Sequence, residues 1–192
     1  MPAAERETPE PRQTGYTYAD ILKEDESGRY ELLDGEAFMM APPSRMHQEI
    51  LGELFTQLHN FLKGKPCKVY PAPFGVRLFP KKDNSDNTFF EPDITVVCDH
   101  SKLDDQGCNG APDMVIEILS PSTARYDLLY KLNKYIQAGV QEYWIIDPQD
   151  KILHVYTLEQ GYYKISNYNP DDTVPVTVLP GCLIDLSAVF AE

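Results

Sequence analysis

Two acidic residues and one lysine have the side-chain types and the spacing that metal-assisted chemistry requires. Asp93 comes directly before a short β-branched run, and Glu117 lies inside the next one, where a carboxylate is costly to bury unless it is paired or bound to a cation. Asp127, Lys131 and Tyr135 then recur at i, i+4 and i+8, which puts all three on one face of a helix. Two carboxylates and an ammonium that converge on one cleft suit a divalent metal ion that assists cleavage of phosphodiester bonds.

Each of these candidates also has a simpler explanation. Asp93 and Glu117 could be capped carboxylates at strand ends. Asp127 and Lys131 could form an i, i+4 ion pair on a solvated helix face, worth only about 0.2–0.5 kcal/mol. The two explanations differ in the direction of the Lys131 ammonium, which points into the cleft if the lysine is catalytic and out to solvent if it is not.

Two further residues are accessory candidates. Glu31 belongs to a predicted hairpin that turns at Asp34-Gly35, and strand alternation puts Glu31 on the same side as the apolar Leu33. Its alternative is a solvent-facing edge strand. His47 lies in the first turn of a predicted helix, residues 44–63, next to the apolar stripe of that helix. Its alternative is a packing or capping residue.

The elements that must position these residues follow from hydrophobic periodicity and turn residues. After helix 44–63 the sequence predicts strands near 68–70 and 75–79, and then strands over 91–98 and 113–119 joined by a loop over 99–112. A helix to Ala138 and a strand over 142–147 follow. The remainder predicts a β meander near 152–157, 162–166 and 174–178. A helix that joins two strands of one sheet makes a crossover, so the sheet is expected to be mixed.

Length and composition fit one domain of ordinary globular character. The chain has 192 residues, 42% of them hydrophobic, and a formal net charge of −13. This charge opposes binding to a nucleic-acid backbone unless a basic patch or a metal ion offsets it. No apolar run is long enough for a membrane span, and the first residues lack the features of a signal peptide, so we expect a cytoplasmic protein. The four cysteines (67, 98, 108 and 182) show neither a Cys-x-x-Cys pair nor zinc spacing, and we expect them to be reduced and structural.

The ordered set of motifs resembles the Uma-two family of restriction-endonuclease-like proteins in the PD-(D/E)XK nuclease superfamily. The matching stretches span roughly residues 17–186 and are Tyr30 to Glu36, Ser44 to His47, Glu91 to Ile94, Val115 to Thr123, Asp127 with Lys131 and Tyr135, and Ala138 to Trp144. The resemblance implies an α/β (α+β) fold with a restriction-endonuclease-like core of helix, three strands, helix and strand, an N-terminal hairpin and a C-terminal β meander. Residues 1–14, which are Pro/Glu/Arg-rich and lack periodicity, are expected to form a flexible tail, and residues 15–192 a single domain of this kind.

The resemblance also implies a metal site and an activity. Asp93 and Glu117 would hold Mg²⁺ or Mn²⁺, and the protein would be an endonuclease that hydrolyses DNA phosphodiester bonds. The lysine that the superfamily has two residues after the glutamate is Leu119 here, and Lys131 is its expected substitute, with Glu31, His47, Asp127 and Tyr135 as accessory residues.

Three questions about function stay open at this point. A catalytically inactive nuclease fold that serves as an interaction module is the alternative to an enzyme, and an RNA-processing nuclease is not separable from a DNA endonuclease by sequence. A homodimer is a further expectation, because tyrosines 156, 162, 163 and 168 enrich the meander in aromatic surface, although these rings could equally cover the sheet.

Overall fold

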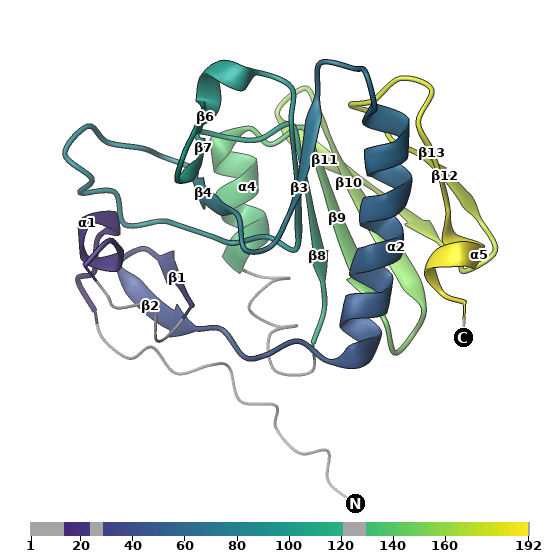
Figure 1. The fold of residues 1–192 in the computed structure, drawn as a ribbon, viewed down its shortest axis with the longest axis horizontal. Helices are drawn as coiled ribbons and strands as arrows, with labels where there is room; N and C mark the ends of the chain where they lie inside the picture. Colours follow the sequence, from purple (N-terminus) through teal and green to yellow (C-terminus); the bar gives the residue numbers. More distant parts are fainter. Residues whose placement is uncertain (1–13, 24–28, 121–129, 192) are drawn as a thin grey trace, which may run out of the picture.

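The computed structural model describes residues 14–23, 29–120 and 130–191, so most of the predicted tail and the candidate Asp127 lie outside the described residues. The centre of the fold is a six-stranded sheet with the strand order β11-β10-β9-β8-β5-β3 (Figure 1). Its strands are β3 (Lys68–Pro71), β5 (Ile94–Val97), β8 (Met114–Ile118), β9 (Glu142–Asp147), β10 (Ile152–Glu159) and β11 (Tyr162–Tyr168).

The sheet is mixed, as the sequence predicts. β8 and β9 are parallel neighbours, and the other adjacent pairs of this sheet are antiparallel. α4 (Leu132–Ala138) lies in the connection between β8 and β9. Gly139 ends this helix with a φ of 83°, and its N–H bonds the carbonyls of Tyr135 and Ile136. The predicted order of helix, three strands, helix and strand is therefore confirmed, with β3, β5 and β8 as the three strands.

One face of the sheet is covered by α2 (Arg45–Leu62). The hydroxyl oxygen of Ser44 caps this helix by accepting a hydrogen bond from the backbone N–H of His47 at 3.2 Å. Four residues at a spacing of four are buried against the sheet: Ile50, Leu54, Leu58 and Leu62. The same hydrophobic cluster is completed by the C-terminal elements β12 (Thr173–Pro175), β13 (Leu183–Asp185) and α5 (Leu186–Val189).

The opposite face is covered by several short elements, which form a second hydrophobic cluster with the sheet. These are α4, the hairpin β1 (Tyr30–Leu33) and β2 (Glu36–Met39), and a three-stranded sheet of β4 (Gly75–Arg77), β7 (Gly107–Asn109) and β6 (Leu103–Asp104) (Figure 1). The predicted hairpin is confirmed. The short helix α1 (Tyr18–Ile21) packs against the hairpin through Tyr18.

The predicted loop over residues 99–112 is wrong, because it contains β6, β7 and the 3₁₀ helix η1 (His100–Lys102). β7 runs parallel to β4 in very close approach, since a Cβ atom added at Gly107 would lie 2.1 Å from the carbonyl oxygen of Gly75. A glycine in a sequence usually indicates a turn, but Gly107 instead allows the backbones of β4 and β7 to approach closely. The predicted third strand of the meander is also corrected, since β12 pairs with β13 in a separate two-stranded sheet.

The tyrosines of the meander mostly cover the sheet. Tyr156 lies between Tyr143 and Tyr163 with ring centroids 5.8 and 6.1 Å away, and the Tyr163 hydroxyl donates to the carbonyl of Val140 at 2.6 Å. Tyr162, by contrast, is exposed. The homodimer stays a prediction. No helix within the described ranges is long and apolar enough to cross a bilayer.

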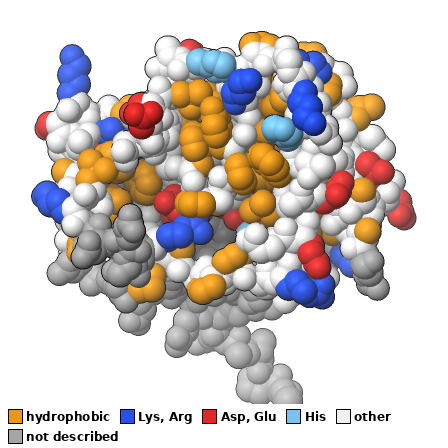
Figure 2. Space-filling view, in the orientation of Figure 1, with side chains coloured by type: hydrophobic (Ala, Val, Ile, Leu, Met, Phe, Trp, Pro, Cys, Tyr) orange, Lys and Arg blue, Asp and Glu red, His pale blue; other side chains and the backbone are white. Residues whose placement is uncertain are grey.

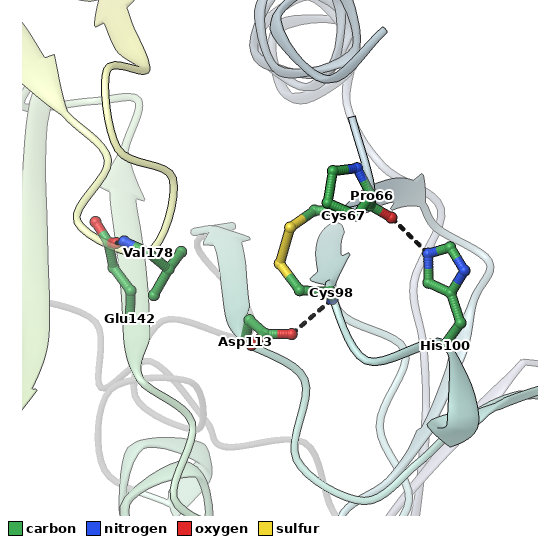
Figure 3. Close-up of a disulfide and its surroundings, with 7 residues drawn as sticks. All are labelled: Pro66, Cys67, Cys98, His100, Asp113, Glu142 and Val178. Atoms are coloured by element: carbon green, nitrogen blue, oxygen red, sulfur yellow. Dashed lines mark hydrogen bonds between the residues drawn. A yellow bond between two sulfur atoms is a disulfide. The ribbon is translucent and has the colours of Figure 1, made fainter. Parts of the chain in front are cut away.

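The expectation that all four cysteines are reduced is wrong for two of them. Cys67 and Cys98 form a disulfide with an S–S distance of 2.09 Å (Figure 3). They meet because β3 and β5 are antiparallel with Lys68 opposite Val97, which brings the two residues just outside this pair together. Their separation of 31 residues hides this register in the sequence. Cys108 and Cys182 are free and buried, and burial raises the pKa of both thiols to about 11, so they stay protonated.

The disulfide can be checked by counting thiols. Protein unfolded in guanidinium without a reductant is expected to react with a thiol reagent at two cysteines, and at four after reduction. Reduction should lower the free energy of unfolding by about 2–4 kcal/mol, because the bond closes a long loop in the unfolded chain. Four reactive thiols before reduction would show that the bond is absent.

A buried carboxylate at the start of β9 should make stability depend on pH. Glu142 is fully buried, and its oxygens accept hydrogen bonds from Trp144 Nε1 at 2.7 Å and the Val178 N–H at 2.9 Å. Burial outweighs these bonds and raises the pKa of Glu142 above its ordinary value. A raised pKa in the folded state means that this group stabilises the fold when protonated and that this stabilisation is lost as the pH rises through the folded pKa.

We therefore expect the free energy of unfolding of the wild type, minus that of Glu142→Gln, to fall between about pH 4.5 and neutral pH. Glutamine keeps the size of the side chain but does not titrate, so other acidic groups cancel in the difference. Urea unfolding at four pH values measures it, and a difference that is constant or rises with pH would contradict the assignment.

Candidate active site

Asp93 and Glu117 lie on neighbouring strands of the central sheet. The antiparallel register of β5 and β8 pairs Ile94 with Ile116, and the next position of this register sets Asp93 opposite Glu117. Strand alternation gives both carboxylates the sheet face of Val97 and Val115, which is the face that α4 covers. Two residues that are 24 positions apart in the chain are therefore side by side.

Glu117 is buried in a cluster with Lys131 and Tyr135. The Lys131 Nζ atom lies 3.0 Å from Glu117 Oε1, and the Tyr135 hydroxyl donates to the same oxygen at 2.9 Å. Lys131 is only 2% exposed, so its ammonium is turned into the protein rather than toward solvent. Burial, and next the neighbouring carboxylate of Glu117, raise the pKa of Tyr135 well above its ordinary value, so this phenol stays protonated and donates.

Glu31 is the second acidic partner of Lys131. The Lys131 Nζ atom lies 2.8 Å from Glu31 Oε1, and the Glu91 N–H donates to that same oxygen at 3.0 Å. Glu31 is 4% exposed, which rules out the alternative of a solvent-facing edge strand. The hairpin β1–β2 therefore contributes a carboxylate to the group that β8 and the segment before α4 build.

Asp93 is held by α2 and by β8. Its Oδ1 atom lies 3.1 Å from Nε2 of His47, and its Oδ2 atom accepts a hydrogen bond from the N–H of Ile118 at 2.7 Å. His47 therefore does more than cap or pack, since its ring contacts the carboxylate at the mouth of β5. The other ring nitrogen, Nδ1, is buried and has no hydrogen-bond partner among the described residues.

The other candidates and neighbours are placed as follows. Asp127 falls outside the described residues. Lys134 is directed elsewhere, because its Nζ atom contacts Asp34 Oδ1 of the β1–β2 turn at 2.6 Å. Six of the seven candidate residues thus come together, namely Asp93, Glu117, Lys131, Tyr135, Glu31 and His47. What each does in a reaction stays a prediction.

Sequence reasoning missed an ion pair that supports the site. Arg29 Nε donates to Glu91 Oε2 at 2.7 Å, and the backbone N–H of this glutamate is the one that bonds Glu31. The two partners are 62 positions apart, so no local spacing links Arg29 to Glu91. The sequence pointed to Glu91 only through its place directly before Pro92-Asp93.

Asp93 and Glu117 supply carboxylate oxygens, which are ligands of the kind that a hard divalent cation prefers. Glu31, Glu117 and Asp93 supply three carboxylates against the single ammonium of Lys131, so the group carries an excess of negative charge when His47 is neutral. Mg²⁺ prefers oxygen ligands and is commonly held by one or two carboxylates, with water and substrate phosphate completing its shell. In the described part of the chain no three His, Cys, Asp or Glu side chains are grouped closely enough to hold a metal ion.

Comparison with known proteins shows the family and the fold of the chain. The uncharacterized protein slr1290 of Synechocystis sp. is 27% identical over 152 residues, which cover 78% of this chain and 77% of that protein. A crystal structure described as that of a "putative nuclease belonging to DUF820" from Anabaena variabilis matches with a TM-score of 0.74 at 22% identity, over 92% of this chain and 98% of that one. This likeness shows the fold. The Uma2 family model, described as "Putative restriction endonuclease", matches residues 16–187. With most of its length matched by that model, the chain belongs to the Uma2 family.

Proposed function

We propose that the protein is a metal-dependent endonuclease that hydrolyses phosphodiester bonds of DNA with Mg²⁺ or Mn²⁺. The observation that carries the proposal is the meeting of Asp93 and Glu117 on adjacent strands with the buried ammonium of Lys131. Membership of the Uma2 family supports a nuclease-like chemistry. The excess of carboxylates over cations supports a role for a divalent ion.

In this proposal the residues have separate roles. Asp93 and Glu117 would hold the cation, which supplies Lewis-acid stabilisation of the phosphate and an activated water when it is bound. Leu119 stands where the superfamily has a lysine, and Lys131 takes over the role of that lysine. Its ammonium stabilises the negative charge that develops on the phosphate oxygens. Tyr135 holds the carboxylate of Glu117 by hydrogen bonding.

Two residues of the proposed site act by positioning others. Glu31 is the second carboxylate that holds the Lys131 ammonium, and its own orientation is fixed by the N–H of Glu91. His47 keeps one oxygen of Asp93 in place while the N–H of Ile118 keeps the other. A carboxylate held at both oxygens is preorganised, which lowers the cost of reaching the reactive geometry.

A catalytically inactive nuclease fold that acts as an interaction module is the second candidate. The contacts of Asp93 favour it, because both oxygens of this carboxylate are already held by the protein, one by His47 and the other by the N–H of Ile118. The net charge of −13 favours it as well. A cleavage assay on DNA and RNA decides between the enzyme and the inactive fold.

The test incubates purified wild-type protein with supercoiled plasmid and, separately, with structured RNA, in EDTA, Mg²⁺, Mn²⁺ or Ca²⁺. We expect nicking and linearisation of the plasmid in Mg²⁺ or Mn²⁺ only. Protein that carries Asp93→Asn, purified in parallel, controls for contaminating nucleases. Cleavage of RNA alone would replace DNA as the substrate, and no cleavage of either nucleic acid in any metal would favour the inactive scaffold.

A further inference from the structure

Positive charge is concentrated in one part of this acidic chain. Residues 54–82 contain six Lys and Arg residues and no Asp or Glu, whereas the rest of the chain contains 11 basic and 30 acidic residues. This stretch runs from the middle of α2 through β3 and β4 to the loop that follows. A local field of this sign opposes the repulsion that the whole molecule exerts on an anion.

Three lysines of this stretch form one surface, here called the basic turn, which consists of residues 63–68, from the residue that follows α2 to the first residue of β3. Lys63, Lys65 and Lys68 are all exposed. The Nε2 atom of His100 lies 2.5 Å from the carbonyl oxygen of Pro66, which adds an exposed histidine to the edge of the turn. Figure 2 shows blue and pale-blue side chains grouped on the upper part of the face in view, beside hydrophobic ones, where Figure 1 has the end of α2 and the start of β3.

The cations of the basic turn are not neutralised by nearby acids. Among the described residues, none of the three lysines lies within ion-pair distance of an Asp or Glu. Lys63 bonds the side-chain oxygen of Asn60 at 2.9 Å, and Lys65 lies over the ring of Phe61 at 3.1 Å from its centroid. Both partners are neutral, so the full charge is available to an anionic ligand.

The turn is also fixed to the sheet. Cys67, between Lys65 and Lys68, is joined by the disulfide to Cys98 at the end of β5 (Figure 3). The N–H of Cys98 is held in turn by Asp113 Oδ2 at 2.7 Å. A charged surface that is ordered before binding loses less entropy when a ligand docks on it.

The distance from the basic turn to the candidate active site matches an extended ligand. His47, which contacts Asp93, is in the first turn of α2, and Lys63 follows its last residue. At 1.5 Å per residue these two positions are about 24 Å apart along the helix axis. This length equals about seven base pairs of duplex DNA at 3.4 Å per pair.

We propose that the basic turn binds the phosphate backbone of a DNA duplex that also reaches Asp93 and Glu117. This inference rests on the proposed function, because the candidate site supplies the reason to choose a phosphodiester polymer over another polyanion. Lys63, Lys65 and Lys68 contact successive phosphates and contribute affinity without reading sequence. An overall acidic protein thereby holds DNA at this surface against the repulsion of its net charge.

The test measures binding in EDTA, so it does not depend on cleavage. A fluorescein-labelled 20-base-pair duplex is titrated with wild type, with Lys63→Gln/Lys65→Gln/Lys68→Gln, and with the control Lys23→Gln/Lys151→Gln/Lys164→Gln, at several salt concentrations. The control changes net charge equally at lysines outside residues 54–82. We expect the basic-turn variant to bind at least tenfold more weakly and to reduce the slope of log K against log salt by about 2–3, while the control stays close to wild type.

The outcomes separate this inference from the nuclease chemistry. If wild type binds DNA and the basic-turn variant does not, the inference holds even when no metal supports cleavage. If both triple variants lose DNA affinity equally, the loss follows from net charge alone, and the inference is wrong. Absence of DNA binding by wild type, or binding of phosphatidylserine vesicles in its place, would overturn it as well. Thermal unfolding of each variant excludes misfolding as the cause of a loss.

Discussion

Replacing Lys131 by methionine is expected to lower the free energy of unfolding at pH 7 by about 3–5 kcal/mol. Lys131 is 2% exposed and lies within 3.0 Å of two buried carboxylates, Glu31 and Glu117. Methionine fills a similar volume but leaves both carboxylates without their counter-ion in a site that water hardly reaches. Guanidinium unfolding of metal-free protein measures the change, and cleavage by any protein that remains folded should also be lost.

Two matched variants test the cause of this loss. Lys134→Met removes a lysine three residues further on, whose partner Asp34 has a side chain that is 62% exposed, and should cost about 0–1 kcal/mol. Glu31→Gln/Lys131→Met removes one of the two carboxylates together with the ammonium, and should recover part of the stability. A single variant Lys131→Met as stable as wild type would mean that the ammonium faces solvent, and the catalytic assignment would then fail.

Replacing Asp93 by asparagine is expected to reduce metal-dependent cleavage by at least about a thousandfold. Loss of one charged ligand removes several kcal/mol of transition-state stabilisation, and each ~1.4 kcal/mol is a factor of ten in rate. The amide keeps one accepting oxygen but puts an NH₂ donor in place of the other, so it can keep only one of the two contacts with His47 and the Ile118 N–H, and stability should also fall by about 1–3 kcal/mol. Calorimetry with Mn²⁺ and a plasmid-nicking assay measure binding and cleavage separately.

The control for this prediction is Asp34→Asn, which removes a mostly exposed carboxylate paired with Lys134. It changes net charge by the same amount and should leave Mn²⁺ affinity and cleavage close to wild type. The assignment of the metal site is wrong if Asp93→Asn binds Mn²⁺ as tightly as wild type. If Asp93→Asn still cleaves DNA although its Mn²⁺ affinity falls, Asp93 binds an ion that the cleavage reaction does not require.

Much of this fold is determined by local sequence. The apolar stripe and the Ser44 cap determine α2, the Asp34-Gly35 turn determines the β1–β2 hairpin, and Gly139 determines the end of α4. These features depend on side chains within about one helical turn or one tight turn of each other, and short-range backbone preferences act over that range. The same local patterns, read in order, indicate a mixed sheet and the Uma2 family, both of which are confirmed.

Only the tertiary structure decided the contacts between strands and helices that are far apart in the sequence. The sequence shows a carboxylate in the run around Glu117, but only the packing of the hairpin against α4 reveals that Lys131 is shared between this carboxylate and Glu31. The register of β3 and β5 likewise joins Cys67 to Cys98. The reason is physical: a local pattern determines which side of a strand faces inward, whereas register and docking depend on the summed packing of many residues far apart in the chain.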